Sequence, residues 1–276
     1  MSNPTPPNNS NVKGAIIAAL ITAFASFAAV FLIFYLNNGT SNATRVNTDQ
    51  SEEISQLREE LEEVERQQKL KIREKIFKNK DNGDDGVYIK ISYPEVYGMS
   101  DAEKQRKINY HIRLSAFAFE EGRNIEEDYD SGSVESAYEV KENNDEYISI
   151  LFRYSLYFGG PYMHYGQSSV NINIASGEPF QLKDLFRHGY KDELSKLIKE
   201  SFRDRNVCGG ETWGLFGVNG NEYFTISRVN IEIHYDRNEA FAGACGAVTA
   251  IIPLRKLEHL INPNGPLGYL SYRGLW

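Results

Sequence analysis

Cysteine is scarce in this sequence, and so are concentrated runs of Lys and Arg. With only Cys208 and Cys245 in 276 residues, the chain is not a disulfide-dense scaffold, and two cysteines so far apart do not make a zinc finger. The formal net charge is −8, from 30 Lys and Arg against 38 Asp and Glu. Because binding to phosphates needs a concentrated basic face, this composition excludes a nucleic-acid partner.

Catalytic signatures are lacking as well. The sequence contains no P-loop, no G-x-S-x-G elbow and no H-E-x-x-H motif. Its five histidines are scattered without partners readable from the sequence, and no second His, Cys or carboxylate stands at the helical spacing of a zinc site from His164. We therefore expect no metal, no cofactor and a non-enzymatic role. A hydrolase whose site is assembled only by the fold stays open as an alternative.

One long apolar segment is present. Residues 15–36 form a run of 22 residues without a charge, which is long enough to cross a hydrocarbon core of about 30 Å. The apolar region of a signal peptide is usually about 7–15 residues long, so we predict an uncleaved transmembrane helix over 14–36. A disordered stub over 1–13 precedes it. The charges on its two sides nearly balance, and the shortness of the stub favours an N-terminus inside and a C-terminal part outside.

A polar linker over 37–50 follows, and then the pattern turns helical. A seam of Ile54, Leu57, Leu61 and Val64 repeats at spacings of three and four, with Glu and Arg between. This pattern predicts a helical, coiled-coil-like stalk over 51–80, through which the chain would dimerise. The alternative is a solvated single helix held by pairs of opposite charge.

The Asn-, Asp- and Gly-rich residues 81–86 mark a boundary, and residues 87–276 form one C-terminal domain. Strands are predicted over 87–93, 133–141, 146–158, 168–174, 228–235 and 247–252. Helices are predicted from a capping box at Ser100, over 182–204 with a break near residue 188, and over 255–261. Because helices alternate with hairpins, the fold class is α+β, a single domain of an antiparallel sheet with helices.

Motifs distributed over 87–261 resemble a known family. They are Ile91-Ser92-Tyr93-Pro94, Lys107-Ile108-Asn109, Gly159-Gly160, Asn171-Ile172-Asn173-Ile174, Leu182-Lys183-Asp184-Leu185-Phe186 and Ile231-Glu232-Ile233-His234-Tyr235. This pattern is similar to the extracytoplasmic domain of the RsiV-type anti-sigma factors, which sense lysozyme. The same domain stands beside the catalytic domain of some PdaC-type peptidoglycan deacetylases.

The resemblance implies a non-catalytic binding or sensor domain outside the bacterial cytoplasmic membrane. Its implied ligand is a lysozyme-like muramidase or a cell-wall fragment. Two features depart from the family. Pro161-Tyr162-Met163-His164 replaces the usual residues after the paired glycines, and a 13-residue stub is too short to hold a sigma factor. A structural spacer that dimerises through the stalk is a further alternative.

Two surface features are candidate binding sites. Eleven carboxylates lie between Glu120 and Glu146; those most concentrated are Glu126, Glu127, Asp128 and Asp130. Such a patch would steer a basic protein such as lysozyme into contact, although a solvated loop and hairpin edge that keeps the domain soluble is the explanation that the pattern favours. Tyr162, His164 and Tyr165 follow flexible glycines and suit sugar stacking or a protein hot spot. The alternative is a connection whose rings cap the core.

The two cysteines each precede a glycine. In an oxidising envelope Cys208 and Cys245 would pair, closing a loop that contributes roughly 4 kcal/mol to stability in the chain-entropy model. Two buried thiols are the alternative. The topology predicted above favours the disulfide.

Overall fold

The computed structural model describes residues 69–79, 86–120, 131–159, 161, 163–210 and 217–273. All of them lie in one compact unit, Glu65–Trp276. The strands in these residues are β1 (Lys71–Lys78), β2 (Gly86–Tyr97), β3 (Ser131–Asn143), β4 (Tyr147–Tyr157), β5 (His164–Asn173), β6 (Tyr223–Ile226), β7 (Asn230–Tyr235) and β8 (Val248–Pro253). The helices are α3 (Ala102–Ala116), α5 (Lys191–Asp204) and α6 (Gly268–Arg273), and short 3₁₀ turns connect several elements.

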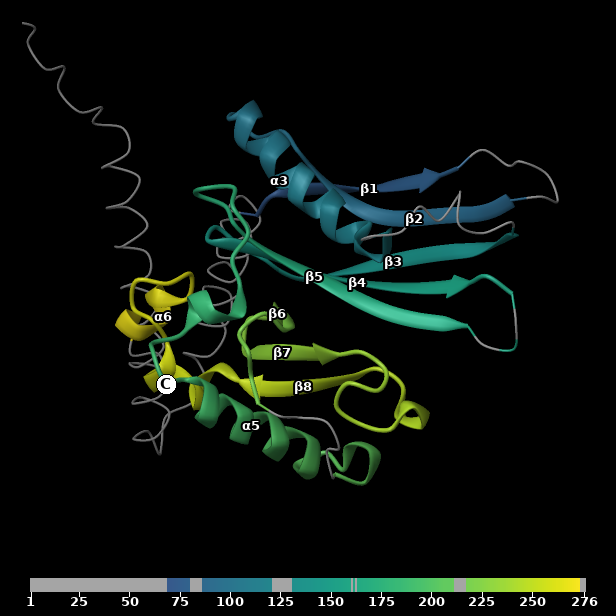
Figure 1. Cartoon of the computed structure of the whole chain (residues 1–276). Coiled ribbons are helices and arrows are strands. Elements are labelled where there is room, and N and C mark those ends of the chain that lie inside the picture. Colours follow the sequence, from purple (N-terminus) through teal and green to yellow (C-terminus); the bar gives the residue numbers. More distant parts are fainter. Residues whose placement is uncertain are drawn as a thin grey trace, which may run out of the picture. The chain divides into compact units, whose positions relative to one another are not determined.

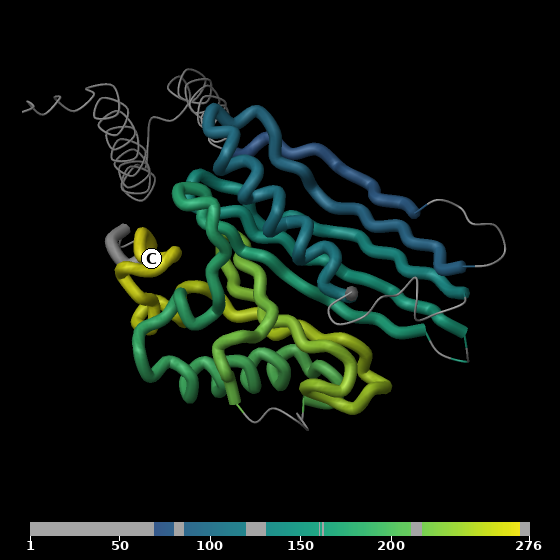
Figure 2. The backbone as a smooth tube through the Cα atoms, turned by 45° about the horizontal axis from the view of Figure 1, so that its top comes forward, coloured from purple at the N-terminus to yellow at the C-terminus, as the bar shows by residue number. Residues whose placement is uncertain are grey.

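The first sheet has five strands in the order β1-β2-β3-β4-β5, and α3 packs against one of its faces (Figures 1 and 2). β2 and β3 are parallel, and the other pairs are antiparallel. The predicted class α+β is therefore correct, but the first sheet is mixed rather than antiparallel. The reason is the connection between β2 and β3, which runs through α3 as a crossover and so returns the chain in the same direction.

The core under α3 follows from the spacing of apolar residues. Ile108, Ile112 and Ala116 recur every four residues and are fully buried, so they form one stripe of the helix. The stripe lies on the alternating apolar residues of β2 and β4, such as Ile91 and Ile150. Asp101 caps the helix by accepting a hydrogen bond of 2.9 Å from the Lys104 amide. The cap is thus one residue later than the predicted Ser100.

The second sheet has three antiparallel strands in the order β6-β7-β8, and α5 runs along one of its faces (Figures 1 and 2). Leu194, Ile198 and Phe202 of α5 are fully buried at spacings of four. They pack against β7 and β8 in a core of their own. The predicted helix over 182–204 is therefore a 3₁₀ turn at Leu182–Leu185 followed by α5.

Polar side chains join the two sheets. Ser149 Oγ, on β4, accepts a hydrogen bond of 2.9 Å from the Ile226 amide of β6. Asn171 Nδ2, on β5, donates one of 2.8 Å to the Phe224 carbonyl, and Ser169 Oγ accepts one of 3.0 Å from the Phe224 amide. The open edge of β6 is thus satisfied by side chains of the first sheet, and no further strand is needed there.

The first strand corrects the predicted stalk. Residues 71–78 were expected to continue a helix to residue 80, because Ile72 and Ile76 are four residues apart. They form β1 instead, paired along its whole length with β2. The strand is more favourable than a helix here because Ile72 and Phe77 pack against the core of the sheet, whereas Ile76 stays 50% exposed. The domain therefore begins before residue 87, and β2 runs past Pro94, where it no longer pairs with β3.

Several predictions fall on residues that the structure does not describe. They are the stub over 1–13, the transmembrane segment over 14–36, the linker over 37–50 and the stalk seam of Ile54, Leu57, Leu61 and Val64. Among the described residues, no helix has the length and apolar character needed to cross a membrane.

Candidate ligand-binding site

A hollow of about 690 Å³ opens on the α3 face of the first sheet, beyond the C-terminal end of that helix. We call it the aromatic hollow. It is lined by Ala118, Phe119, Tyr154, Leu156, Phe158, Gly159, His164, Tyr165, Gly166 and Asp236. The lining residues come from the 3₁₀ turn Ala118–Glu120 after α3, from β4 and the residues that follow it, from β5 and from the residue after β7, so only the tertiary structure brings them together.

The wall of the hollow depends on a glycine. Tyr154 and Gly166 are direct partners across β4 and β5, and a Cβ at Gly166 would overlap the Tyr154 ring. The absence of a side chain at Gly166 lets the ring lie flat across the neighbouring strand. Phe119 packs against the same ring, with 5.8 Å between the ring centroids. Three sequence regions thus build one aromatic surface.

Asp236 is the only carboxylate in the described lining. Its Oδ1 accepts a hydrogen bond of 3.1 Å from the main-chain amide of Gln167 on β5. Partial burial, together with the negative charge of Glu239, raises the pKa of Asp236 to about 6, although the Gln167 bond acts in the opposite direction. The described part of the chain places no Lys or Arg in the lining and none within ion-pair distance of this carboxylate.

The predicted aromatic loop contributes to the hollow. His164 and Tyr165 line it, and Tyr165 is 62% exposed. They lie at the start of β5 rather than in a loop, paired with Leu156 and Ser155. Their exposure disagrees with the alternative in which the rings cap the core. Tyr162 lies outside the described residues.

The acidic stretch is described only in part. Glu126, Glu127, Asp128 and Asp130 lie outside the described residues. Within the described part, Glu139 forms ion pairs of 2.9 Å with Lys141 and 3.1 Å with Arg153. Hydrogen bonds from Lys141 and Arg153 lower the pKa of the Glu139 carboxyl.

Lys141 connects the two sheets. Besides Glu139 of β3, it pairs with Glu232 of β7 over 2.9 Å, so this one lysine bridges a carboxylate of each sheet.

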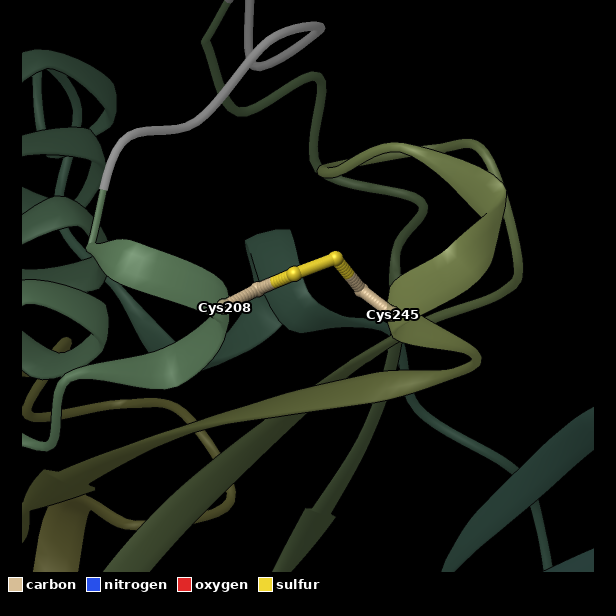
Figure 3. Close-up of a disulfide and its surroundings, with 2 residues drawn as sticks. All are labelled: Cys208 and Cys245. Carbon is tan, nitrogen blue, oxygen red and sulfur yellow. A yellow bond between two sulfur atoms is a disulfide. The ribbon is translucent and has the colours of Figure 1, made fainter.

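The predicted disulfide is present. Cys208, in the 3₁₀ turn Val207–Gly209 after α5, is bonded to Cys245, in the 3₁₀ turn Gly243–Cys245 between β7 and β8 (Figure 3). Their Cα atoms lie 5.9 Å apart, which is ordinary for a disulfide. Cys208 is exposed, so the bond is accessible to reagents in solution.

His234 is structural, as its place in an alternating strand predicts. It is buried between Thr225 and Thr249, whose hydroxyl oxygens lie 2.9 Å and 3.1 Å from its two ring nitrogens. Burial, with the nearby charge of Lys141, lowers the pKa of His234 to about 3. The ring is therefore neutral, and it does not face the aromatic hollow.

Sequence reasoning missed Asp236, Tyr154 and Gly166. Tyr154 was visible only as one member of an alternating strand, and Asp236 as one carboxylate after another strand. A glycine inside a strand, at Gly166, is the one signal that pointed here, because such a residue often marks a close approach. Among the described residues, no three His, Cys, Asp or Glu side chains gather closely enough to hold a metal ion.

Comparisons with known proteins give a fold. No family model matches the chain, and no curated protein matches it. A DUF3298 family protein from Bacteroides fragilis is similar in structure, with a TM-score of 0.54 and 15% identity over 72% of this chain and 97% of that one. A DUF3298 family protein from Pseudomonas aeruginosa PAO1 has a TM-score of 0.55 and 13% identity over 71% and 95%. The chain therefore shares its fold with these two DUF3298 family proteins.

Proposed function

We propose that the chain is a membrane-anchored binding or sensor module of a bacterial cell envelope. Residues 14–36 are its anchor in the cytoplasmic membrane, and the described domain stands outside. The uncharged run of 22 residues supports the anchor. The disulfide between Cys208 and Cys245 supports the outside location, because such bonds persist in oxidising compartments.

The ligand that the aromatic hollow suits best is a basic protein. Asp236 carries the argument, because this carboxylate lies beside an aromatic surface and no described Lys or Arg pairs with it. An incoming Arg side chain would stack on Tyr154 and pair with this carboxylate, which is how arginine contributes to interface hot spots. The RsiV-type resemblance makes a lysozyme-like muramidase the candidate protein. A cell-wall fragment is the other ligand that the resemblance implies.

The hydrolase alternative is less well supported. Glycoside hydrolysis commonly uses two carboxylates that flank the scissile bond, whereas the described lining of the hollow holds Asp236 alone. The third possibility, a dimeric spacer, depends on the seam at Leu57 and Leu61, which the structure does not describe.

Binding of lysozyme to the full chain in detergent micelles tests the proposal. We expect Asp236→Asn to weaken binding about tenfold or more, since it removes a desolvated partner of a cation. Asp192→Asn, at an exposed position on α5, is the matched control and should bind as the wild type does. Affinity should also fall as the pH is lowered through about 6, where Asp236 becomes protonated.

Three results would argue against this ligand. Equal affinity of wild type and Asp236→Asn would remove the hollow from the contact. Binding of purified muropeptides but not of lysozyme would favour the cell-wall fragment. Release of reducing ends from peptidoglycan by the wild type, lost in Asp236→Asn, would favour the hydrolase.

A further inference from the structure

The face of the first sheet opposite α3 carries a row of exposed tyrosines. Tyr88 on β2 pairs with Ser133 on β3, and Ser133 pairs with Tyr157 on β4. Directly paired residues lie on the same face of a sheet, so the two tyrosines flank a serine across three strands. The next row on this face consists of Lys78, Lys90, Glu135, Ser155 and Tyr165. We call these two rows the open face.

None of the described helices or strands covers the open face. Tyr88 is 42% exposed and Tyr157 is 39% exposed, whereas their strand neighbours Val87 and Leu156 are buried. The second sheet meets this side of the first sheet elsewhere, at Ser149, Ser169 and Asn171. A sheet face normally packs against another layer, and an uncovered face with large aromatic side chains marks an interaction surface.

The polar groups of the open face are available to a ligand. Lys90 and Glu135 are neighbours across β2 and β3. Neither side chain makes an ion pair or hydrogen bond with any residue that the structure describes. Together with Lys78, which pairs with Lys90 across β1 and β2, they give the face two ammonium donors and one carboxylate acceptor for the polar groups of a ligand.

We propose that the open face binds a β-1,4-linked glycan strand of amino sugars by stacking sugar rings on Tyr88 and Tyr157. Two inter-strand steps place the two tyrosines about 9–10 Å apart, close to the length of one disaccharide of such a strand. Rings one and three of a trisaccharide then reach both tyrosines, with the middle ring over Ser133. Lys90 and Glu135 lie beside this path, within reach of hydroxyl and N-acetyl groups.

This inference rests on the proposed function for its setting, because the bacterial envelope holds such strands. Its two stacking residues, Tyr88 and Tyr157, do not line the aromatic hollow, although Tyr165 belongs to both surfaces. Binding at the hollow depends on Asp236, and binding at the open face depends on Tyr88 and Tyr157. A negative result at one of the two surfaces therefore leaves the proposal for the other surface standing.

Calorimetric titration of the full chain in micelles with β-1,4-linked N-acetylglucosamine oligomers tests the inference. We expect the trimer and hexamer to bind, and the dimer to bind about tenfold more weakly because it reaches only one tyrosine. Tyr88→Ala and Tyr157→Ala should each weaken hexamer binding by up to about tenfold through loss of ring stacking. Tyr110→Ala is the matched control, since this tyrosine is 60% exposed on α3, away from the open face.

Circular dichroism melting separates binding from folding, because all three tyrosines are exposed and their loss should leave the melting temperature unchanged. Asp236→Asn should bind the hexamer as the wild type does, even if it no longer binds lysozyme. The inference is overturned if the hexamer does not bind, if the dimer binds as well as the hexamer, or if Tyr110→Ala weakens binding as much as Tyr157→Ala. Loss of lysozyme binding alone in the Tyr88 and Tyr157 variants would assign the face to a protein partner and also overturn it.

Discussion

The main-chain amide of Gln167 donates a hydrogen bond of 3.1 Å to Oδ1 of Asp236. The side-chain amide of the same glutamine donates another, also of 3.1 Å, to the carbonyl of Tyr235. One buried residue of β5 therefore holds the end of β7 in two places. This contact fixes the carboxylate at the rim of the aromatic hollow, where it is partly removed from water.

Replacing Asp236 by Asn should stabilise the fold at neutral pH. Burial raises the pKa of this carboxyl to about 6, above its usual value of 3.8, so the folded state binds the proton more tightly than the unfolded state does. The protonated carboxyl therefore stabilises the folded state at low pH, and this contribution is lost as the pH rises through about 6. Chemical denaturation at pH 5 and pH 8 should show a larger gain for Asp236→Asn at pH 8. A gain of the same size at both values would contradict the assigned pKa.

Replacing Gly166 by Ala should change the aromatic hollow more than it changes stability. The new methyl group would displace the Tyr154 ring, and the displaced ring lies at the wall of the hollow. We expect a fall in the melting temperature of a few degrees, because the half-buried ring must shift at the rim of the core, and a loss of lysozyme binding of about tenfold. Normal binding with a large loss of stability would show that Gly166 serves packing alone.

Replacing His234 by Gln should make the protein less sensitive to acid. The pKa of His234 is lowered from 6.5 to about 3 by burial and by the charges of Lys141 and Arg153, which Glu139 partly offsets. Its stabilising effect is therefore complete above pH 6.5 and is lost as the pH falls towards 3, by about 4–5 kcal/mol at most.

Urea denaturation between pH 4 and pH 7 measures this dependence for wild type and His234→Gln. The variant should lose about 1–2 kcal/mol at pH 7, since Thr225 and Thr249 lose their present partner. Its stability should then change less with pH than that of the wild type. Parallel pH curves for the two proteins would rule out His234 as the acid-sensitive group.

Removing the disulfide should destabilise the domain. The bond closes a loop with a sequence separation of 37, for which the chain-entropy model gives about 4 kcal/mol. Replacing both cysteines by Ser should lower the unfolding free energy by a similar amount, and added reductant should leave that variant unchanged. Thiol titration of the unreduced wild type in denaturant should detect no free thiol.

Local patterns allowed several elements to be predicted correctly. The alternation of apolar and polar residues in β4 and the four-residue spacing of Leu194, Ile198 and Phe202 in α5 each depend on neighbouring residues alone. The same kind of evidence failed for β1. The spacing of Ile72 and Ile76 fits a helix, and only pairing with β2 makes the strand more favourable.

Sequence alone determined the α+β class, the place of the apolar segment over 15–36 and the pair of cysteines available for a disulfide, because each depends on composition or on a short-range period. Only the tertiary structure decided the parallel pairing of β2 with β3, the aromatic hollow and the open face. Asp236 reaches Gln167 over 69 residues, and Tyr88 shares a face with Tyr157 only through Ser133. Strand register and crossover direction are non-local properties, so no local pattern encodes which side chains they place together.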